Sequence, residues 1–78
     1  MRAKELRLIV TFHTTTSAMA MEKVCGERKV PGRLIPVPRD ITAGCGMAWS
    51  APVDARDSVE KTAREAGIET DGWYELMV

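Results

Sequence analysis

Apolar side chains occupy every second position along residues 6–13: Leu6, Leu8, Val10 and Phe12. The positions between them are polar except for Ile9. Successive side chains of a strand point to opposite faces of a sheet, so this period of two predicts a strand that is covered on one face.

A run of hydroxyl residues, 14–17, follows this strand and supplies several candidate N-caps for a helix. The apolar stripe of that helix has helical spacing: Ala18, Met21, Val24 and Cys25. The stripe fades before Pro31 and Gly32, so we expect a helix over about residues 15–28.

Two short strands are predicted in the middle of the chain. Residues 33–37 favour a strand at a sheet edge, because Pro36 has no N–H to give to a neighbouring strand. Residues 47–51 predict a further strand, which ends at Pro52.

A second helix and a last strand complete the pattern. Asp54 and Asp57 place acid in the first turn of this helix. Its buried stripe is expected to comprise Ala55, Val59, Thr62, Ala63 and Ala66. Gly67 followed by Ile68 predicts a Schellman-type helix end. A turn at Asp71-Gly72 then leads into a strand over residues 73–78.

The order βαββαβ predicts an α+β fold in one domain, residues 1–78: a ferredoxin-like plait with a four-stranded antiparallel sheet and two helices on one face. In this plait the first and third strands are the central, antiparallel pair and the others are the edges. His13, residues 14–17 and Cys45 should then share one end of the sheet, and Cys25 should lie at the opposite end.

The second face of such a sheet is expected to be open. Ile9 and one of the two tryptophans, Trp49 or Trp73, would form an apolar patch there. Pairing of two such faces would give a homodimer.

Composition and charge narrow the classes of function. Eleven basic and eleven acidic residues cancel, so the basic footprint of a nucleic-acid binder or of an anionic-membrane binder is missing. No apolar run is long enough to span a bilayer and the N-terminal residues do not resemble a signal peptide, so we expect a cytoplasmic protein. With two cysteines, one histidine and no CxxC motif, neither a disulfide framework nor a metal site is expected, and no cofactor is implied.

Cys45 is the candidate reactive residue. It lies between Gly44 and Gly46, which carry no Cβ atoms to crowd the sulfur and allow backbone angles closed to other residues. The alternative is a tight turn whose middle residue happens to be cysteine.

Three further features could activate this thiol. The N-terminus of the first helix, beginning at Thr14, would stabilise a thiolate through its dipole and free amides. Arg39 lies in the same loop and could be a charge partner, or it could be a solvated turn residue. His13 could act as a base from across the central strand pair, or it could be a polar strand end with no function.

Cys25 has a different environment, because it falls on the apolar stripe of a helix. A buried thiol there behaves as a small hydrophobic group, so we expect a structural role. Its expected distance from Cys45 disfavours a redox switch made of the two cysteines.

A family resemblance is carried by residues 33–39, Arg-Leu-Ile-Pro-Val-Pro-Arg, together with Cys45-Gly46 and with four earlier positions: Phe12, Thr14, Ala18 and Glu22. The resemblance is to the selenium/sulfur carrier-like family of small bacterial proteins. It runs from about residue 8 to residue 49, is sharpest over residues 34–46 and is looser over the second helix. The Cys-Gly of the family maps onto Cys45 and Gly46, and its Pro-x-Pro-Arg onto residues 36–39.

The resemblance implies a carrier that holds sulfur or selenium on Cys45 as a persulfide or selenopersulfide. The partners would be a donor, such as a cysteine desulfurase, and an acceptor enzyme, and the carrier need not be an enzyme in its own right. The competing hypothesis is a non-catalytic small-ligand-binding or regulatory module that pairs through its open sheet face, with the loop ligating a small molecule or anion.

Overall fold

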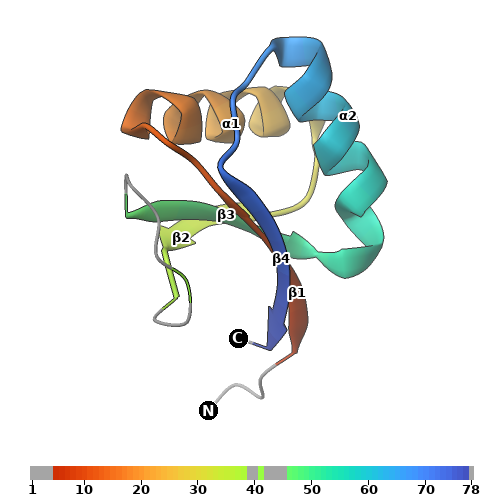
Figure 1. Cartoon of the computed structure of the whole chain (residues 1–78). Helices are drawn as coiled ribbons and strands as arrows, with labels where there is room; N and C mark the ends of the chain where they lie inside the picture. Colours follow the sequence, from red (N-terminus) through yellow and green to blue (C-terminus); the bar gives the residue numbers. More distant parts are fainter. Residues whose placement is uncertain (1–4, 39–40, 42–45, 78) are drawn as a thin grey trace.

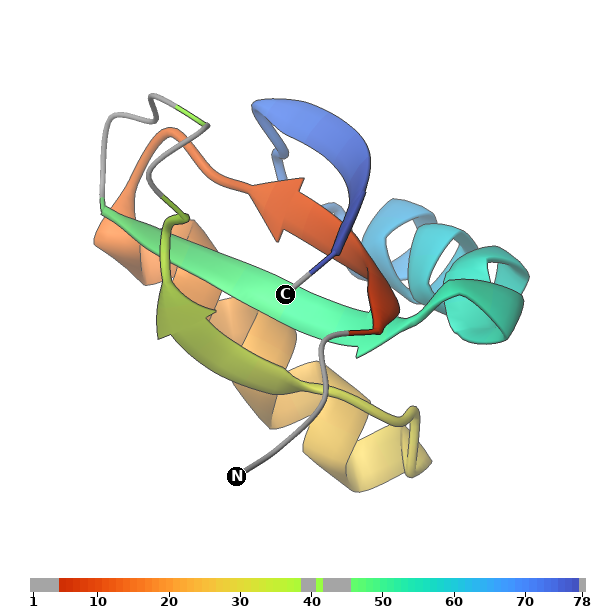
Figure 2. The same cartoon turned by 90° about the horizontal axis from the view of Figure 1, so that it is seen from below.

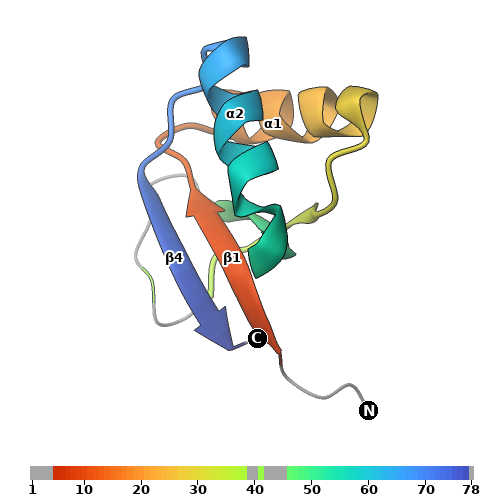
Figure 3. The same cartoon turned by 90° about the vertical axis from the view of Figure 1, so that its right-hand side faces the viewer.

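The computed structural model describes residues 5–38, 41 and 46–77. Along the chain it contains β1 (Leu6–Thr11), α1 (Thr15–Arg28), β2 (Arg33–Pro36), β3 (Met47–Pro52), the 3-10 turn η1 (Val53–Ala55), α2 (Arg56–Ala66) and β4 (Gly72–Met77). The fold is α+β, with both helices packed on one side of a four-stranded sheet (Figures 1 and 3).

The sheet has the strand order β2-β3-β1-β4, and every neighbouring pair is antiparallel. The prediction that the first and third strands form the central pair is therefore confirmed, as are the edge positions of β2 and β4. Thr11 at the end of β1 lies opposite Ala48 near the start of β3. The sheet end that carries the β1–α1 junction thus also carries the entry to β3 (Figure 2).

Helix α1 begins and ends where the sequence predicts. Thr14 is its N-cap, and the Thr14 hydroxyl oxygen accepts a hydrogen bond from the Ser17 N–H at 3.1 Å. At the other end Lys29 adopts a left-handed conformation with φ of 58°. The Val30 N–H then bonds to the Cys25 carbonyl at 2.8 Å, and the helix ends at Arg28, three residues before Pro31.

Helix α2 ends as predicted but starts differently. Gly67 is left-handed, with φ of 68°, and the Ile68 N–H bonds to the Ala63 carbonyl at 3.0 Å, as in a Schellman motif. Ala55, predicted on the helical stripe, is buried but belongs to the preceding 3-10 turn. Ala66 was expected on the buried stripe and is exposed, because it is the last helical residue.

The main core lies between the sheet and the helices. Leu8, Val10 and Phe12 from the β1 region pack against buried residues of both helices: Ala18, Met21 and Cys25 of α1, and Val59 and Ala63 of α2. Trp49 belongs to this core and Trp73 packs against it. Val10 points to the helix-covered face of β1, and it pairs with Trp49 on β3 and with Trp73 on β4. Both tryptophans therefore lie on the helix-covered face, and the prediction that one of them lies on the second face is wrong.

The second sheet face is also covered in part, which corrects the prediction that β1 is buried on one face only. Ile9 and Thr11 are completely buried. Ile9 forms a second apolar cluster with Ala48 and Ile41, and the latter comes from the connection between β2 and β3. Ile9 therefore does not form an exposed patch.

Candidate functional site

The connection between β2 and β3 contains the predicted reactive cysteine. Of its predicted site residues, Gly46 is described, whereas Arg39, Gly44 and Cys45 lie outside the described residues. Gly46 is exposed, and its φ of 77° lies in the left-handed region that favours glycine. The Gly46 carbonyl accepts a hydrogen bond from the Val37 N–H at 3.0 Å, which closes the connection at its base.

The N-terminus of α1 lies at the same sheet end as Gly46. This follows from the pairing of Thr11 with Ala48, because α1 starts four residues after Thr11 and β3 starts one residue after Gly46. The first turn of α1 carries no acidic side chain that would neutralise the positive end of its dipole. The positive end of the α1 dipole therefore lies at the sheet end where β3 begins.

Thr14 is the N-cap residue of α1. Besides accepting from the Ser17 N–H, its hydroxyl donates to the Ser17 Oγ at 3.1 Å. Thr14 is exposed. Its side chain acts locally as a cap, so any contribution to an anion or thiolate would come through the helix backbone that it organises.

His13 lies beside the same helix terminus and its nearest charged partner is Asp71. The His13 Nε2 is 3.5 Å from the Asp71 Oδ1, a contact that becomes an ion pair when the imidazole is protonated. The His13 side chain is 59% exposed. Asp71 precedes β4, on the side of β1 away from β3, so this contact draws the imidazole away from the strand that Gly46 enters.

Cys25 is buried in the main core, as predicted. Burial raises the pKa of its thiol, and the nearby Arg28 charge lowers it by a smaller amount. A thiol with a raised pKa that is closed off from solvent is a poor nucleophile. Cys25 is therefore part of the packing rather than of a reactive site.

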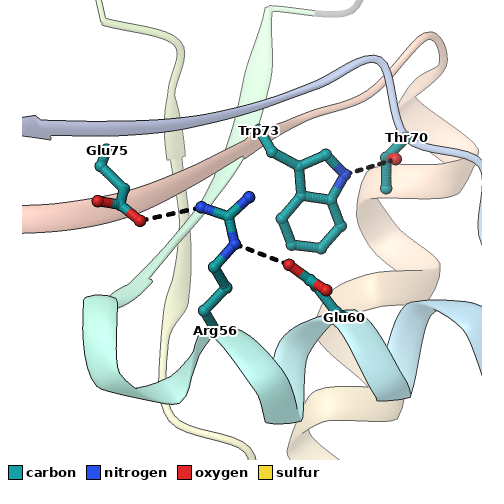
Figure 4. Close-up of polar contacts among 5 residues, drawn as sticks. All are labelled: Arg56, Glu60, Thr70, Trp73 and Glu75. Carbon is teal, nitrogen blue, oxygen red and sulfur yellow. Dashed lines mark hydrogen bonds and ion pairs between the residues drawn. The ribbon is translucent and has the colours of Figure 1, made fainter.

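A second polar cluster, which sequence reasoning missed, joins α2 to β4 (Figure 4). The Arg56 guanidinium donates to Glu60 Oε2 at 2.7 Å and to Glu75 Oε2 at 2.9 Å, and it lies 5.9 Å from the centre of the Trp73 ring. The Trp73 indole N–H donates to the Thr70 hydroxyl at 3.0 Å. The i,i+4 spacing of Arg56 and Glu60 could have been found in the sequence, but the contacts with β4 are long-range.

This cluster borders an open cavity of about 410 Å³, which is also lined by Ala63, Arg64 and Ile68. The hydrogen bond to Glu60, and to a smaller extent the one to Glu75, raise the pKa of Arg56. Arg56 therefore stays charged, and both carboxylates pair with that charge. The arrangement fastens β4 to α2. The partly buried Trp73 and the exposed cation Arg64 both line the cavity.

The described residues contain neither a metal-ligand cluster nor a helix that could span a membrane. No three side chains of histidine, cysteine, aspartate or glutamate come together there as a metal site would need. None of the helices in that part of the chain has the length and apolar character to cross a membrane.

Comparison with known proteins identifies a family for this chain. The family described as "Putative Se/S carrier protein-like" matches residues 7–75, which is most of the chain. The chain belongs to this family. No curated protein and no solved structure matches.

The match to the Se/S carrier-like family covers more of the chain than residues 8–49, over which the sequence resemblance was described. The matched residues include both helices, all four strands in whole or in part, and the Cys45-Gly46 pair. They also include the cluster around Arg56 and Trp73.

Proposed function

We propose that the chain is a sulfur or selenium carrier that holds a persulfide or selenopersulfide on Cys45. The observation that carries this proposal is the family match over residues 7–75, which contains Cys45 as the candidate thiol. The buried state of Cys25 supports the assignment, because it leaves Cys45 as the cysteine suited to exchange.

The transfer step is a thiol exchange at sulfur. The Cys45 thiolate attacks the terminal sulfur of a donor persulfide, forming the Cys45 S–S bond while the S–S bond of the donor breaks. The donor cysteine leaves as a thiolate, and the proton balance is completed by water. Sulfane sulfur moves from one thiol to another with no external oxidant or reductant, and the same step in reverse passes it to an acceptor.

The fold supports activation of this thiol. We class it as a ferredoxin-like plait, because β1 and β3 form its centre, β2 and β4 its edges, and both helices cover one face. This topology puts the entry to β3 and the N-terminus of α1 at one end of the sheet. A helix N-terminus lowers the pKa of a nearby thiol and so raises the reactive thiolate fraction.

In this proposal the other predicted site residues assist the Cys45 thiol. Gly44 and Gly46 give the donor access to the sulfur, and Arg39 is a candidate charge partner of the thiolate. Thr14 organises the helix terminus, and His13 is retained as a candidate base only when it is released from Asp71.

The partners in this proposal are proteins: a donor such as a cysteine desulfurase, and an acceptor enzyme. Catalysis is shared with the donor, so the chain serves as an accessory carrier. A reducing compartment, the cytoplasm, suits an unprotected exchanging thiol. The predicted homodimer would pair two second sheet faces through an exposed patch that includes Ile9. Ile9 is buried within the chain, so it cannot contribute to such an interface.

The test is incubation with a cysteine desulfurase and cysteine, followed by intact-mass analysis. The wild-type chain should gain the mass of one sulfur, and a reductant should remove it. Cys45→Ser should gain none, whereas Cys25→Ser should still be loaded. Reductant-labile sulfur on Cys45→Ser, or no loading of the wild type by any candidate donor, would contradict the carrier function in favour of the binding-module alternative.

A further inference from the structure

The open cavity between α2 and β4 has a preformed apolar lining. Its volume of about 410 Å³ is within the range of small-molecule sites, and all of its lining residues belong to the described part of the chain. Ala63 and Ile68 are joined by the hydrogen bond from the Ile68 N–H to the Ala63 carbonyl. Ile68 and Trp73 are half-buried, and both pack against the main core. The cavity therefore offers an apolar surface that is held by the core behind it.

The Trp73 ring is fixed by two contacts at this cavity (Figure 4). Its indole N–H donates to the Thr70 hydroxyl at 3.0 Å, and the Arg56 guanidinium lies 5.9 Å from the ring centre. A side chain that is ordered before a ligand arrives loses little conformational freedom on binding. Trp73 is thus suited to pack against a flat apolar group of a ligand.

Arg56 already pairs with the two carboxylates beside the ring. Its guanidinium bonds to Glu60 at 2.7 Å and to Glu75 at 2.9 Å. Glu60 lines the cavity, whereas Glu75 lies on β4 outside the lining. Because each carboxylate has a cation bonded to it, the cavity disfavours a cationic ligand.

Arg64 is the second guanidinium of the lining, and it is exposed. It makes no hydrogen bond or ion pair within the described part of the chain. Its charge contributes to the lowered pKa of the adjacent Glu65, but that carboxylate forms its ion pair with Arg28. The Arg64 guanidinium is therefore available to a carboxylate, which it can bind through two parallel hydrogen bonds.

We propose that this cavity binds a small organic acid whose carboxylate pairs with Arg64 and whose apolar group packs on Trp73. The Thr70 oxygen accepts the indole N–H, so the Thr70 O–H remains free to donate to the same ligand. The inference is independent of the proposed carrier function, because every lining residue belongs to α2, to β4 or to the connection between them.

The two indole N–H groups give the experiment an internal control. Each tryptophan contributes one indole signal to a two-dimensional proton–nitrogen NMR spectrum, and Trp73→Phe and Trp49→Phe assign the two signals. Phenylacetate, which joins a carboxylate to a flat apolar ring, is titrated into the full-length chain at neutral pH. The Trp73 signal should shift to saturation with a Kd on the order of 1 mM, as expected for a ligand of about ten non-hydrogen atoms. The Trp49 signal should not move, because Trp49 is buried in the main core.

Arg64→Gln tests the carboxylate contact, and Lys61→Gln is its matched control. Both variants remove one exposed positive charge from α2, but only Arg64 lines the cavity. Arg64→Gln should weaken phenylacetate binding about threefold to fivefold, the size expected for an exposed ion pair. Lys61→Gln should leave the Kd unchanged. Phenylacetamide, which keeps the ring and has no charge, should bind the wild type as weakly as phenylacetate binds Arg64→Gln.

Four results would overturn the proposal: no shift of the Trp73 signal at about 20 mM phenylacetate, equal affinities for phenylacetate and phenylacetamide, an equal loss in Arg64→Gln and Lys61→Gln, or binding of acetate as tight as that of phenylacetate. A peptide that ends in a free phenylalanine carboxylate carries the same two groups. Binding of this peptide more than about tenfold tighter than phenylacetate would assign the cavity to a protein C-terminus and would overturn the small acid as its ligand. An unmoved Trp49 signal verifies that the fold of each variant is intact.

Discussion

The α-carbon of Gly32 lies directly against the indole of Trp49. A Cβ atom added at Gly32 would lie 2.5 Å from the Trp49 Nε1 and 2.7 Å from the Ser50 carbonyl oxygen. Gly32 also has a φ of 137°, which other residues rarely adopt. Trp49 as a whole is 3% exposed, and its indole N–H has no hydrogen-bond partner among the described residues. The turn before β2 is thus shaped around a buried tryptophan.

Gly32→Ala should therefore destabilise the fold by about 1 to 3 kcal/mol, the usual range for overpacking. Gly26→Ala is the matched control, because Gly26 is inside α1 and an added Cβ meets nothing within 4 Å. That change should stabilise the protein by about 0.5 to 1 kcal/mol through the better helix propensity of alanine. Urea unfolding followed by circular dichroism measures both.

The contact between Gly32 and Trp49 also predicts non-additive energetics. In a Trp49→Phe background the clash at Nε1 is removed, so Gly32→Ala should cost less than it does in the wild type. The destabilisation that remains in this background measures the clash with the Ser50 carbonyl and the backbone strain at residue 32. Equal costs in the two backgrounds would show that the tryptophan does not limit residue 32.

The two tryptophans should differ in their access to solvent. Trp49 is within the main core, whereas Trp73 is half-buried beside the open cavity and contacts Arg56. A chain that keeps only Trp49 (Trp73→Phe) should show blue-shifted fluorescence with little acrylamide quenching. A chain that keeps only Trp73 (Trp49→Phe) should be quenched more strongly. Equal quenching of the two would contradict the core position of Trp49.

Cys25→Ser should lower the free energy of unfolding by about 1 to 3 kcal/mol, because it places a hydroxyl at a fully buried position. Cys25→Ala removes the same sulfur without adding a polar group, so it separates the cost of the hydroxyl from the cost of lost packing. Urea titration of all three chains gives the values. A serine variant as stable as wild type would contradict the buried position of Cys25.

The elements that could be predicted from the sequence are those whose signals are local. The bounds of α1 follow from the Thr14 cap and the apolar stripe, and the end of α2 follows from Gly67-Ile68. The central pairing of β1 with β3 followed from element order, because few topologies accommodate βαββαβ.

The features that could not be predicted depend on contacts between residues far apart in the chain. Nothing near Ile41 in the sequence signals that it packs on Ile9, and nothing near Arg56 signals that it lies over Trp73. The choice of sheet face for the tryptophans likewise depended on strand register, which alternation alone does not fix. At the candidate site, the start of α1 lies at the sheet end where β3 begins, as element order predicts, whereas the roles of Cys45 and of its neighbours stay predictions.

The two helices are joined by an ion pair that should make stability depend on pH. The Arg28 Nη1 lies 2.6 Å from the Glu65 Oε1, and this hydrogen bond is the main reason why the pKa of Glu65 is below its ordinary value. A carboxylate whose pKa is lowered by folding adds stability above its unfolded pKa of about 4.3. That contribution is lost as the pH falls through the lower, folded value.

Glu65→Gln should therefore reduce the urea midpoint at pH 7, and its difference from wild type should shrink as the pH is lowered through the unfolded pKa of about 4.3 and then through the lower, folded pKa of Glu65. Both side chains are partly exposed, so the effect should be small and should weaken further in high salt. Glu22→Gln removes an exposed carboxylate of α1 and serves as the control for the change in net charge. A difference for Glu65→Gln that is constant from pH 7 to 3 would mean that the carboxylate charge does not stabilise the α1–α2 contact.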